Sequence, residues 1–236
     1  MLFPIRDDAP TYNRPYVTIG LIVLNSLIFL YSQTLGYAGF QSFLKTLGYV
    51  PWYFFGPIHY NLPTWVYATP ITSMFLHGGW MHLIGNMVFL WIYGNNIEDY
   101  FGPIKFTLFY LASGLAAIGL YTLFNPDSQI PLVGASGAIA GVMGAYMVRH
   151  PRAEITCLLF FFFITFVTLP AKIVLGIWFV YQIIMSVFQS SSGGGVAFLA
   201  HVGGFIFGWA VIKIIYKIRG PGGRASGGQQ VYRVQW

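Results

Sequence analysis

Long apolar stretches alternate with short polar ones along most of this chain, and six of them approach the length of a membrane-spanning helix. A helix needs about 20 mostly apolar residues to cross the hydrocarbon core of a bilayer. The pattern therefore predicts an all-α polytopic membrane protein built as a bundle of six transmembrane helices. The expected spans are residues 16–35, 79–93, 104–124, 137–148, 171–188 and 198–215.

Two stretches fit this pattern less simply. Residues 155–188 are too long for one ordinary helix, but two helices there would make seven spans and place the basic C-terminus outside. We therefore expect the segment ITCLLFFFFITFVT to be interfacial or re-entrant, with Pro170 marking the restart before the fifth span. Residues 36–70, rich in aromatic residues and proline, are expected to fold against or into the outer leaflet. They form either an interfacial belt or one wall of a site.

Composition supports a membrane protein. The chain is 56% hydrophobic and 8% charged, with a mean hydropathy of +0.66, whereas about a quarter of the residues in soluble domains are charged. The start MLFPIRDDAP lacks the apolar core of a cleavable signal peptide, so we expect the first helix to be retained. The expected organisation is a short cytoplasmic N-terminus (1–15), a six-helix membrane domain (16–216) and a flexible cytoplasmic tail (217–236).

The net charge of +6 reflects orientation in the membrane rather than nucleic-acid binding. With the N-terminus inside, eleven of the twelve Lys and Arg residues fall on the cytoplasmic side and only Lys45 falls outside. This asymmetry follows the positive-inside rule. We expect a multi-pass protein of the cell inner membrane with both termini in the cytoplasm.

Four polar side chains are expected at one depth in the membrane. At about 1.5 Å of rise per helical residue, Ser136, His201 and Asn86 lie roughly 18–20 Å above the inner boundary, and His82 about 24 Å above it. Polar groups at membrane depth are costly and point to function. We therefore expect these four residues to form a site.

Glycines on the fourth and sixth spans explain how these side chains meet. Gly137 and Gly141, like Gly204 and Gly208, are four residues apart, which gives each helix a flat face and permits close backbone approach. Gly134, together with Gly137, lets the chain descend to the serine between them and start a tightly packed helix. Close packing of the two spans would bring the hydroxyl toward the imidazole.

A serine needs a base to act as a nucleophile, and histidine is the usual one. All six acidic residues fall in termini, loops or span ends, so the chain supports a Ser136–His201 pair without a carboxylate, and packing or another hydrogen bond must orient the imidazole. His82 and Asn86 share one face of the second span, where they serve either as oxyanion donors or as structural hydrogen-bonding groups. His77 lies off that face, and we expect a structural role for it.

Metal and thiol chemistry are not expected. The sequence holds no H-E-x-x-H motif, and two histidines without a carboxylate or thiolate partner make a poor zinc site. The single cysteine, Cys157, excludes an internal disulfide and is interpreted as a packing residue. We expect no cofactor.

The motifs GASG around Ser136, AHVGGFIFG around His201 and HLIGN from His82 to Asn86 resemble the signatures of the rhomboid family of intramembrane serine proteases. The resemblance covers about residues 16–216. It implies a Ser136 nucleophile, a His201 general base and acid, and an oxyanion site made by His82, Asn86 and the Ser136 backbone N–H.

The resemblance also implies a mobile lid in QSSSGGGVAF and a structural role for Glu98 in GNNIEDYFG. The chain departs in two places from patterns that many or some family members show. Trp65 is followed by Val66 rather than arginine. The position four residues after the serine is Ala140, which removes one aromatic partner for the imidazole.

The expected function is hydrolysis of peptide bonds in or near the transmembrane segments of other membrane proteins. The expected partners are these transmembrane substrates and the lipid bilayer. The alternative is a proteolytically inactive rhomboid-like factor that binds membrane proteins. A transporter or channel is disfavoured because the sequence shows neither internal repeats nor charges along a membrane pathway.

Overall fold

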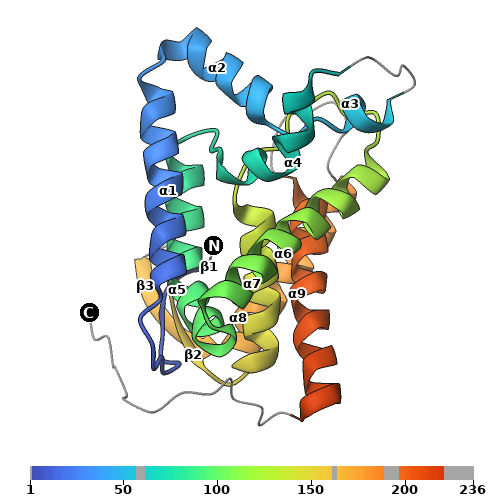
Figure 1. Cartoon of the computed structure of the whole chain (residues 1–236). Coiled ribbons are helices and arrows are strands. Elements are labelled where there is room, and N and C mark those ends of the chain that lie inside the picture. Colours follow the sequence, from blue (N-terminus) through green and yellow to red (C-terminus); the bar gives the residue numbers. More distant parts are fainter. Residues whose placement is uncertain (1, 57–61, 161–163, 189–196, 221–236) are drawn as a thin grey trace.

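The computed structural model describes residues 2–56, 62–160, 164–188 and 197–220. Six long helices run through this part of the chain and form a bundle (Figure 1). They are α1 (Tyr16–Gln33), α5 (Trp80–Phe101), α6 (Pro103–Phe124), α7 (Ser136–Arg149), α8 (Ala171–Phe188) and α9 (Phe198–Arg219). This arrangement confirms the all-α polytopic fold.

Each long helix coincides with one predicted span. The start of α8 directly after Pro170 is as expected. Two helices run further than predicted, because α5 continues to Phe101 and α9 to Arg219, three residues into the expected tail. Residues 189–196 of the expected lid and residues 221–236 of the expected tail lie outside the described part of the chain.

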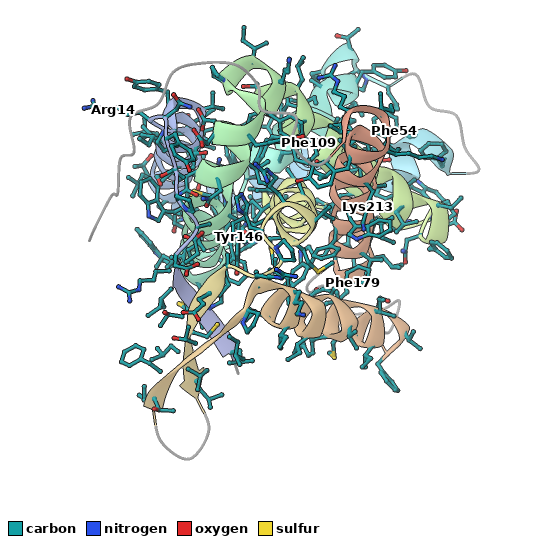
Figure 2. The ribbon with its side chains drawn as sticks, turned by 90° about the horizontal axis from the view of Figure 1, so that it is seen from below. Arg14, Phe54, Phe109, Tyr146, Phe179 and Lys213 are labelled. Atoms are coloured by element: carbon teal, nitrogen blue, oxygen red, sulfur yellow. The ribbon has the colours of Figure 1, made fainter. Side chains whose placement is uncertain are left out.

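Four of the helices, α1, α6, α8 and α9, are long and apolar enough to cross a membrane on their own. The helix α7 has only 14 residues, and at about 1.5 Å per residue it is shorter than a bilayer core. It packs against α5, α6, α8 and α9 and lies in the middle of the helices when the bundle is seen from below (Figure 2). Protein therefore surrounds α7.

The outward faces of the outer helices are apolar. Large side chains on α1 and α8 are exposed, including Leu27 and Leu30 on α1 and Ile177, Val180 and Ile184 on α8. Such continuous apolar surfaces are unusual for a protein in water and match the hydrocarbon of a bilayer. The molecule is a multi-pass integral membrane protein.

Short helices cover one end of the bundle, where Figure 1 shows α2, α3 and α4. This cap belongs to the long connection between α1 and α5, and it is tied to the α6–α7 connection by backbone hydrogen bonds between Tyr49 and Leu132 (3.1 and 2.7 Å). The described part of the connection thus packs against the protein, and its expected contact with the outer leaflet stays a prediction. Its elements are α2 (Gly36–Leu47), α3 (Pro51–Phe55), η1 (Thr64–Ala68), α4 (Thr69–Thr72) and η2 (Ser73–Phe75).

A three-stranded antiparallel sheet lies near the other end of the bundle, in the order β1 (Leu2–Asp7), β2 (Glu154–Phe160) and β3 (Ile164–Pro170). The sequence predicted neither the strand near the N-terminus nor the strands in the aromatic stretch. The period-two signal is present, since Ile155 and Cys157 are fully buried and Thr156 between them is not. The surrounding apolar run hides this alternation. Cys157 is a buried free thiol, as its interpretation as a packing residue requires.

The ends of the helices are joined through acidic side chains. The Glu98 carboxylate, in the last turn of α5, accepts hydrogen bonds from the backbone N–H groups of Val17 (2.9 Å) and Thr18 (2.7 Å). These groups belong to the first turn of α1, where backbone donors have no partner within the helix. Glu98 therefore has the structural role that was expected.

Candidate active site

The helices α7 and α9 pack through the predicted glycines. A Cβ atom on Gly204 would overlap the backbone carbonyl of Gly137, and one on Gly208 would overlap that of Gly141. Because Gly204 pairs with Gly137 and Gly208 with Gly141, the two helices run in the same direction. The first turns of α7 and α9 therefore lie at the same end of the bundle, and they carry the candidate serine and histidine.

Ser136 and His201 are in direct contact. His201, in the first turn of α9, places its Nε2 atom 2.8 Å from the hydroxyl oxygen of Ser136, the first residue of α7. Ser136 is partly exposed, whereas His201 is 9% exposed. The serine is thus partly accessible, whereas the imidazole is buried.

The chain enters α7 through a strained turn. Gly134 has a φ of +128°, a conformation that residues with a side chain rarely adopt, and its N–H donates to the carbonyl of Ser73 (2.9 Å). A Cβ atom on Gly134 would lie 2.7 Å from Nε2 of His82. Glycine therefore provides both the turn before Ser136 and the space that the His82 ring occupies.

The second nitrogen of His201 meets a residue that the sequence interpretation missed. The Nδ1 atom of His201 lies 2.8 Å from Oε1 of Gln182 on α8, and the Gln182 side chain is 4% exposed. Trp178, one turn earlier on α8, lies beside the imidazole with ring centroids 5.8 Å apart. A glutamine within an otherwise apolar span was the available signal.

The two oxyanion candidates lie on one face of α5, and a histidine that precedes this helix contacts both of them. The Asn86 amide donates to Nε2 of His77 (3.0 Å), and the rings of His77 and His82 meet edge to face at 5.1 Å. His77 thus makes the structural hydrogen bond that we expected. The Asn86 amide has a second N–H, so its bond to His77 is compatible with either predicted role.

The acidic residues take part in other contacts. Asp7 in β1 accepts a hydrogen bond from the hydroxyl of Tyr146 (2.5 Å), and Asp99 accepts two hydrogen bonds from Asn13 (2.8 and 2.6 Å). Burial raises the pKa of Asp7 from 3.8 to about 6. Within the described residues, no three His, Cys, Asp or Glu side chains are close enough to hold a metal ion.

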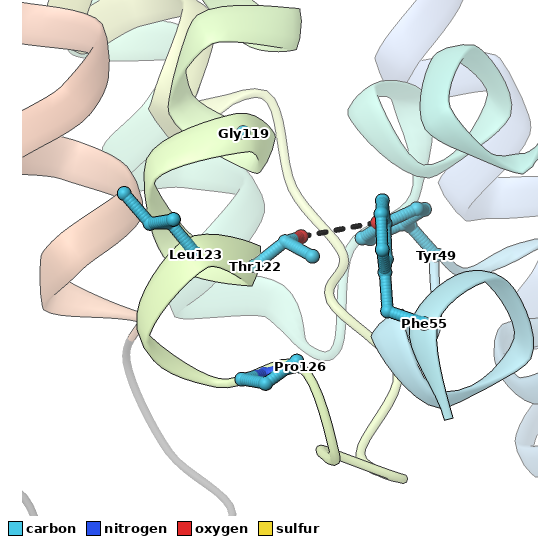
Figure 3. Close-up of a pocket in the computed structure, with 6 residues that line it drawn as sticks. All are labelled: Tyr49, Phe55, Gly119, Thr122, Leu123 and Pro126. Atoms are coloured by element: carbon cyan, nitrogen blue, oxygen red, sulfur yellow. Dashed lines mark hydrogen bonds between the residues drawn. The ribbon is translucent and has the colours of Figure 1, made fainter. Parts of the chain in front are cut away.

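A pocket on the capped end of the bundle is separate from this site. It is lined by residues of the cap, of the second half of α6 and of the connection that follows α6, and the Tyr49 and Thr122 hydroxyls hydrogen-bond across it at 3.0 Å (Figure 3). None of the predicted site residues lines it. This pocket is therefore not the site of the reactive groups, which the packing of α7 against α9 brings together.

The fold and the site define a class: a polytopic membrane protein in which a buried histidine contacts a partly exposed serine on a neighbouring helix. Comparison with known families agrees with this class. A family model described as the rhomboid domain matches residues 64–218, which is more than half of the chain. The chain belongs to the rhomboid family.

Three relatives illustrate the similarity. Rhomboid protein 1, mitochondrial, of Saccharomyces cerevisiae is 31% identical over 63% of this chain and 43% of its own length. RHOMBOID-like protein 6, mitochondrial, of Arabidopsis thaliana is 46% identical over 33% of this chain and 24% of its own length. Rhomboid protease GluP of Bacillus subtilis is 40% identical over 35% of this chain and 15% of its own length. The chain thus spans less than half the length of these relatives.

Proposed function

We propose that this chain is an intramembrane serine protease that hydrolyses peptide bonds in or near the transmembrane segments of other membrane proteins. The observation that carries the proposal is the 2.8 Å contact between Ser136 Oγ and His201 Nε2 across the glycine-packed helices α7 and α9. Membership in a family that includes a protein named as a protease supports it.

In the acylation step, His201 Nε2 removes the proton from the Ser136 hydroxyl as Oγ attacks the carbonyl carbon of the scissile peptide. A tetrahedral intermediate forms, with a negative charge on the former carbonyl oxygen. When it collapses, the C–N bond breaks, and the imidazolium gives its proton to the departing amine. Water then hydrolyses the acyl-enzyme by the same steps, with His201 again acting first as a base and then as an acid.

The oxyanion requires hydrogen-bond donors at the start of α7. The Ser136 backbone N–H lies in the first turn of a helix, where N–H groups have no partner within the helix. His82 lies beside Gly134, two residues before the serine, and Asn86 lies one turn further along α5. We assign these three groups to oxyanion stabilisation.

We further propose that the reactive end of the bundle faces outward and that both termini are cytoplasmic in the cell inner membrane. The pairing of α7 with α9 supports this orientation, because Arg149 and Arg219 end two helices that run in the same direction. Lys45 lies in the cap at the opposite end. Basic residues favour the cytoplasmic side.

A fluorophosphonate probe tests the nucleophile without knowledge of the natural substrate. It should label the purified protein in detergent, because the activated Oγ displaces fluoride from phosphorus, and Ser136→Ala and His201→Ala should both abolish labelling. Ser113→Ala is the matched control, because Ser113 is a buried serine on α6 whose hydroxyl donates to the Phe109 carbonyl (2.8 Å). Labelling of Ser136→Ala would show that the nucleophile is misassigned.

The same assay separates the protease from its alternative, an inactive rhomboid-like binding factor. A folded wild-type protein that neither reacts with the probe nor cleaves a labelled transmembrane peptide would support the binding factor. The peptide should carry Gly and Pro near the outer end of its span, because a carbonyl within an intact helix is hydrogen-bonded and shielded.

A further inference from the structure

Gln182 is a polar residue on a helix whose other side chains largely face outward. Its neighbours Tyr181 and Ile183 are 51% and 42% exposed, whereas Gln182 is 4% exposed. A buried amide at membrane depth is costly unless it is hydrogen-bonded. Its partner is the imidazole of His201.

Three side chains from three helices form a continuous chain of hydrogen bonds. Gln182 Oε1 on α8 lies 2.8 Å from His201 Nδ1 on α9, and His201 Nε2 lies 2.8 Å from Ser136 Oγ on α7. Each ring nitrogen of the histidine therefore has one partner. This arrangement fixes the plane of the ring as well as its position.

We propose that Gln182 is a positioning residue that holds His201 in the tautomer and orientation required to accept the proton of Ser136. The inference rests on the proposed protease function and extends it by one residue. Gln182 does not touch the substrate in this role, and it acts only through the histidine.

A neutral imidazole carries a single proton, and the nitrogen that holds this proton decides whether His201 can act as a base toward Ser136. If the Gln182 carbonyl oxygen faces Nδ1, that nitrogen carries the proton and donates it, and the lone pair of Nε2 faces the Ser136 hydroxyl. If the amide were reversed, its NH₂ group would donate to Nδ1, and Nε2–H would face the serine. Both networks satisfy every partner, but only the first allows Ser136 to lose its proton to His201.

A neutral acceptor suits this depth in the membrane. A carboxylate would stabilise the imidazolium more strongly, but an ionised side chain buried beside an apolar helix face costs several kcal/mol of desolvation. Trp178 lies one turn from Gln182 on the same face of α8 and packs against the imidazole. The helix α8 thus orients the histidine through two contacts, and the family's aromatic position on α7 is occupied by Ala140.

The test compares Gln182→Leu and Gln182→Glu with the wild type in the full-length protein. Cleavage of the labelled transmembrane peptide gives kcat and KM, and the fluorophosphonate gives a labelling rate that does not depend on peptide binding. Gln182→Leu removes the acceptor and should lower kcat and the labelling rate about ten- to a hundredfold, with little change in KM. Ser186→Ala removes a partly exposed hydroxyl on the same helix that donates to the Ile183 carbonyl (2.7 Å), and it should leave both rates unchanged.

Gln182→Glu retains a carboxyl oxygen facing Nδ1 and should restore most of the rate lost in Gln182→Leu. Its negative charge stabilises the imidazolium, so the acidic limb of the pH–rate profile should move to higher pH. His82 is another titratable side chain at the site, beside Gly134, and it is unchanged in all variants. A residue that serves packing alone predicts instead that Gln182→Leu and Gln182→Glu have similar kcat values, because Leu and Glu fill a similar volume.

Wild-type kcat in Gln182→Leu, or an unshifted profile in Gln182→Glu, would overturn the inference. If Gln182→Leu does not fold, the profile of Gln182→Glu decides. Failure of the proposed function is recognised separately, because either the wild type would neither react with the probe nor cleave the peptide, or Ser136→Ala would keep the wild-type activity. If Ser136→Ala loses the activity but Gln182→Leu keeps the wild-type kcat and labelling rate, only the positioning role is rejected.

Discussion

Gly204→Ala tests whether close packing of α7 and α9 is what brings the serine and histidine together. Gly204 lies three residues after His201, and a Cβ atom at this position would overlap the carbonyl of Gly137, the residue after Ser136. The substitution adds one methyl group at the point where the two backbones are in contact. It changes neither of the two reactive side chains.

The expected displacement follows from the geometry. An ordinary contact with a Cβ atom is 3.4–4 Å, so the added methyl group must separate the two helices locally by about 1–2 Å, since protein interiors have little free space. The Ser136–His201 distance of 2.8 Å would then exceed the limit of a hydrogen bond, about 3.5 Å. We expect a loss of about 1–3 kcal/mol in stability from overpacking and a roughly hundredfold lower rate from misplacement of the reacting groups.

The assay combines the rate of fluorophosphonate labelling with thermal unfolding in detergent. Gly176→Ala on α8 is the matched control, because a Cβ atom there meets no other atom within 4 Å. This control should label at the wild-type rate and unfold at the same or a slightly higher temperature, since alanine is favoured over glycine in helices. Wild-type labelling and unfolding of Gly204→Ala would refute the explanation by helix packing.

Three further predictions concern other parts of the molecule. Asn86→Ala and His82→Ala should each lower kcat about ten- to a thousandfold, which is the range for one lost oxyanion donor, and should change KM less. Wild-type kcat in both folded variants would favour a structural role for these side chains. Glu98→Ala leaves the first turn of α1 without its acceptor and should lower the free energy of unfolding by about 1–3 kcal/mol, whereas unchanged unfolding would show that water replaces the carboxylate. Burial raises the pKa of Asp7 from 3.8 to about 6, so its protonated form favours the folded state. That contribution, about 3 kcal/mol at about 1.4 kcal/mol per pKa unit, is fully present below pH 4 and is lost as the pH rises through 6. Unfolding measured between pH 4 and 7 should therefore show a smaller pH dependence in Asp7→Asn, which keeps an acceptor for Tyr146, and an equal dependence would exclude Asp7 as its source.

The helices of the bundle were predictable because each depends on local features of the sequence. Length and hydropathy mark the spans, and Pro170 marks the start of α8. The end of α5 was placed too early because Glu98 and Asp99 signal the boundary of the apolar region rather than the end of the helix. Polar residues in a last turn do not end a helix when a neighbouring helix provides their partners.

The sheet was not predictable from the same signals. Strand β2 obtains its partners from β1, which begins more than 150 residues earlier in the chain, and from β3. Such pairing is a long-range property, and a local run of aromatic residues is consistent with a strand or with a buried helix. Strand β1 was not predicted for the same reason, because nothing in residues 2–7 alone indicates a partner.

The candidate site was likewise predictable only in part. The glycine spacings and the shared depth of Ser136 and His201 predicted that they would meet, and the structure places them 2.8 Å apart. Gln182 was missed because its position relative to the imidazole depends on how α8 packs against α9, which no motif records. The sequence did show that some group other than a carboxylate had to orient the histidine.

The structure suggests a reason for the separation of charge from the reactive groups. The carboxylates of Asp7, Glu98 and Asp99 accept hydrogen bonds in the sheet or at helix ends. Glu98 and Asp99 accept from backbone N–H groups that would otherwise be unpaired. The serine–histidine contact instead lies among neutral partners. An ionised residue beside it would require desolvation of a full charge, whereas Gln182 leaves the resting site uncharged. Under the proposed mechanism, charge develops there only during the reaction, when the imidazolium and the oxyanion form together and attract each other. Rigid neutral groups can stabilise that pair without reorganisation, and the glycine contacts between α7 and α9 provide the required rigidity.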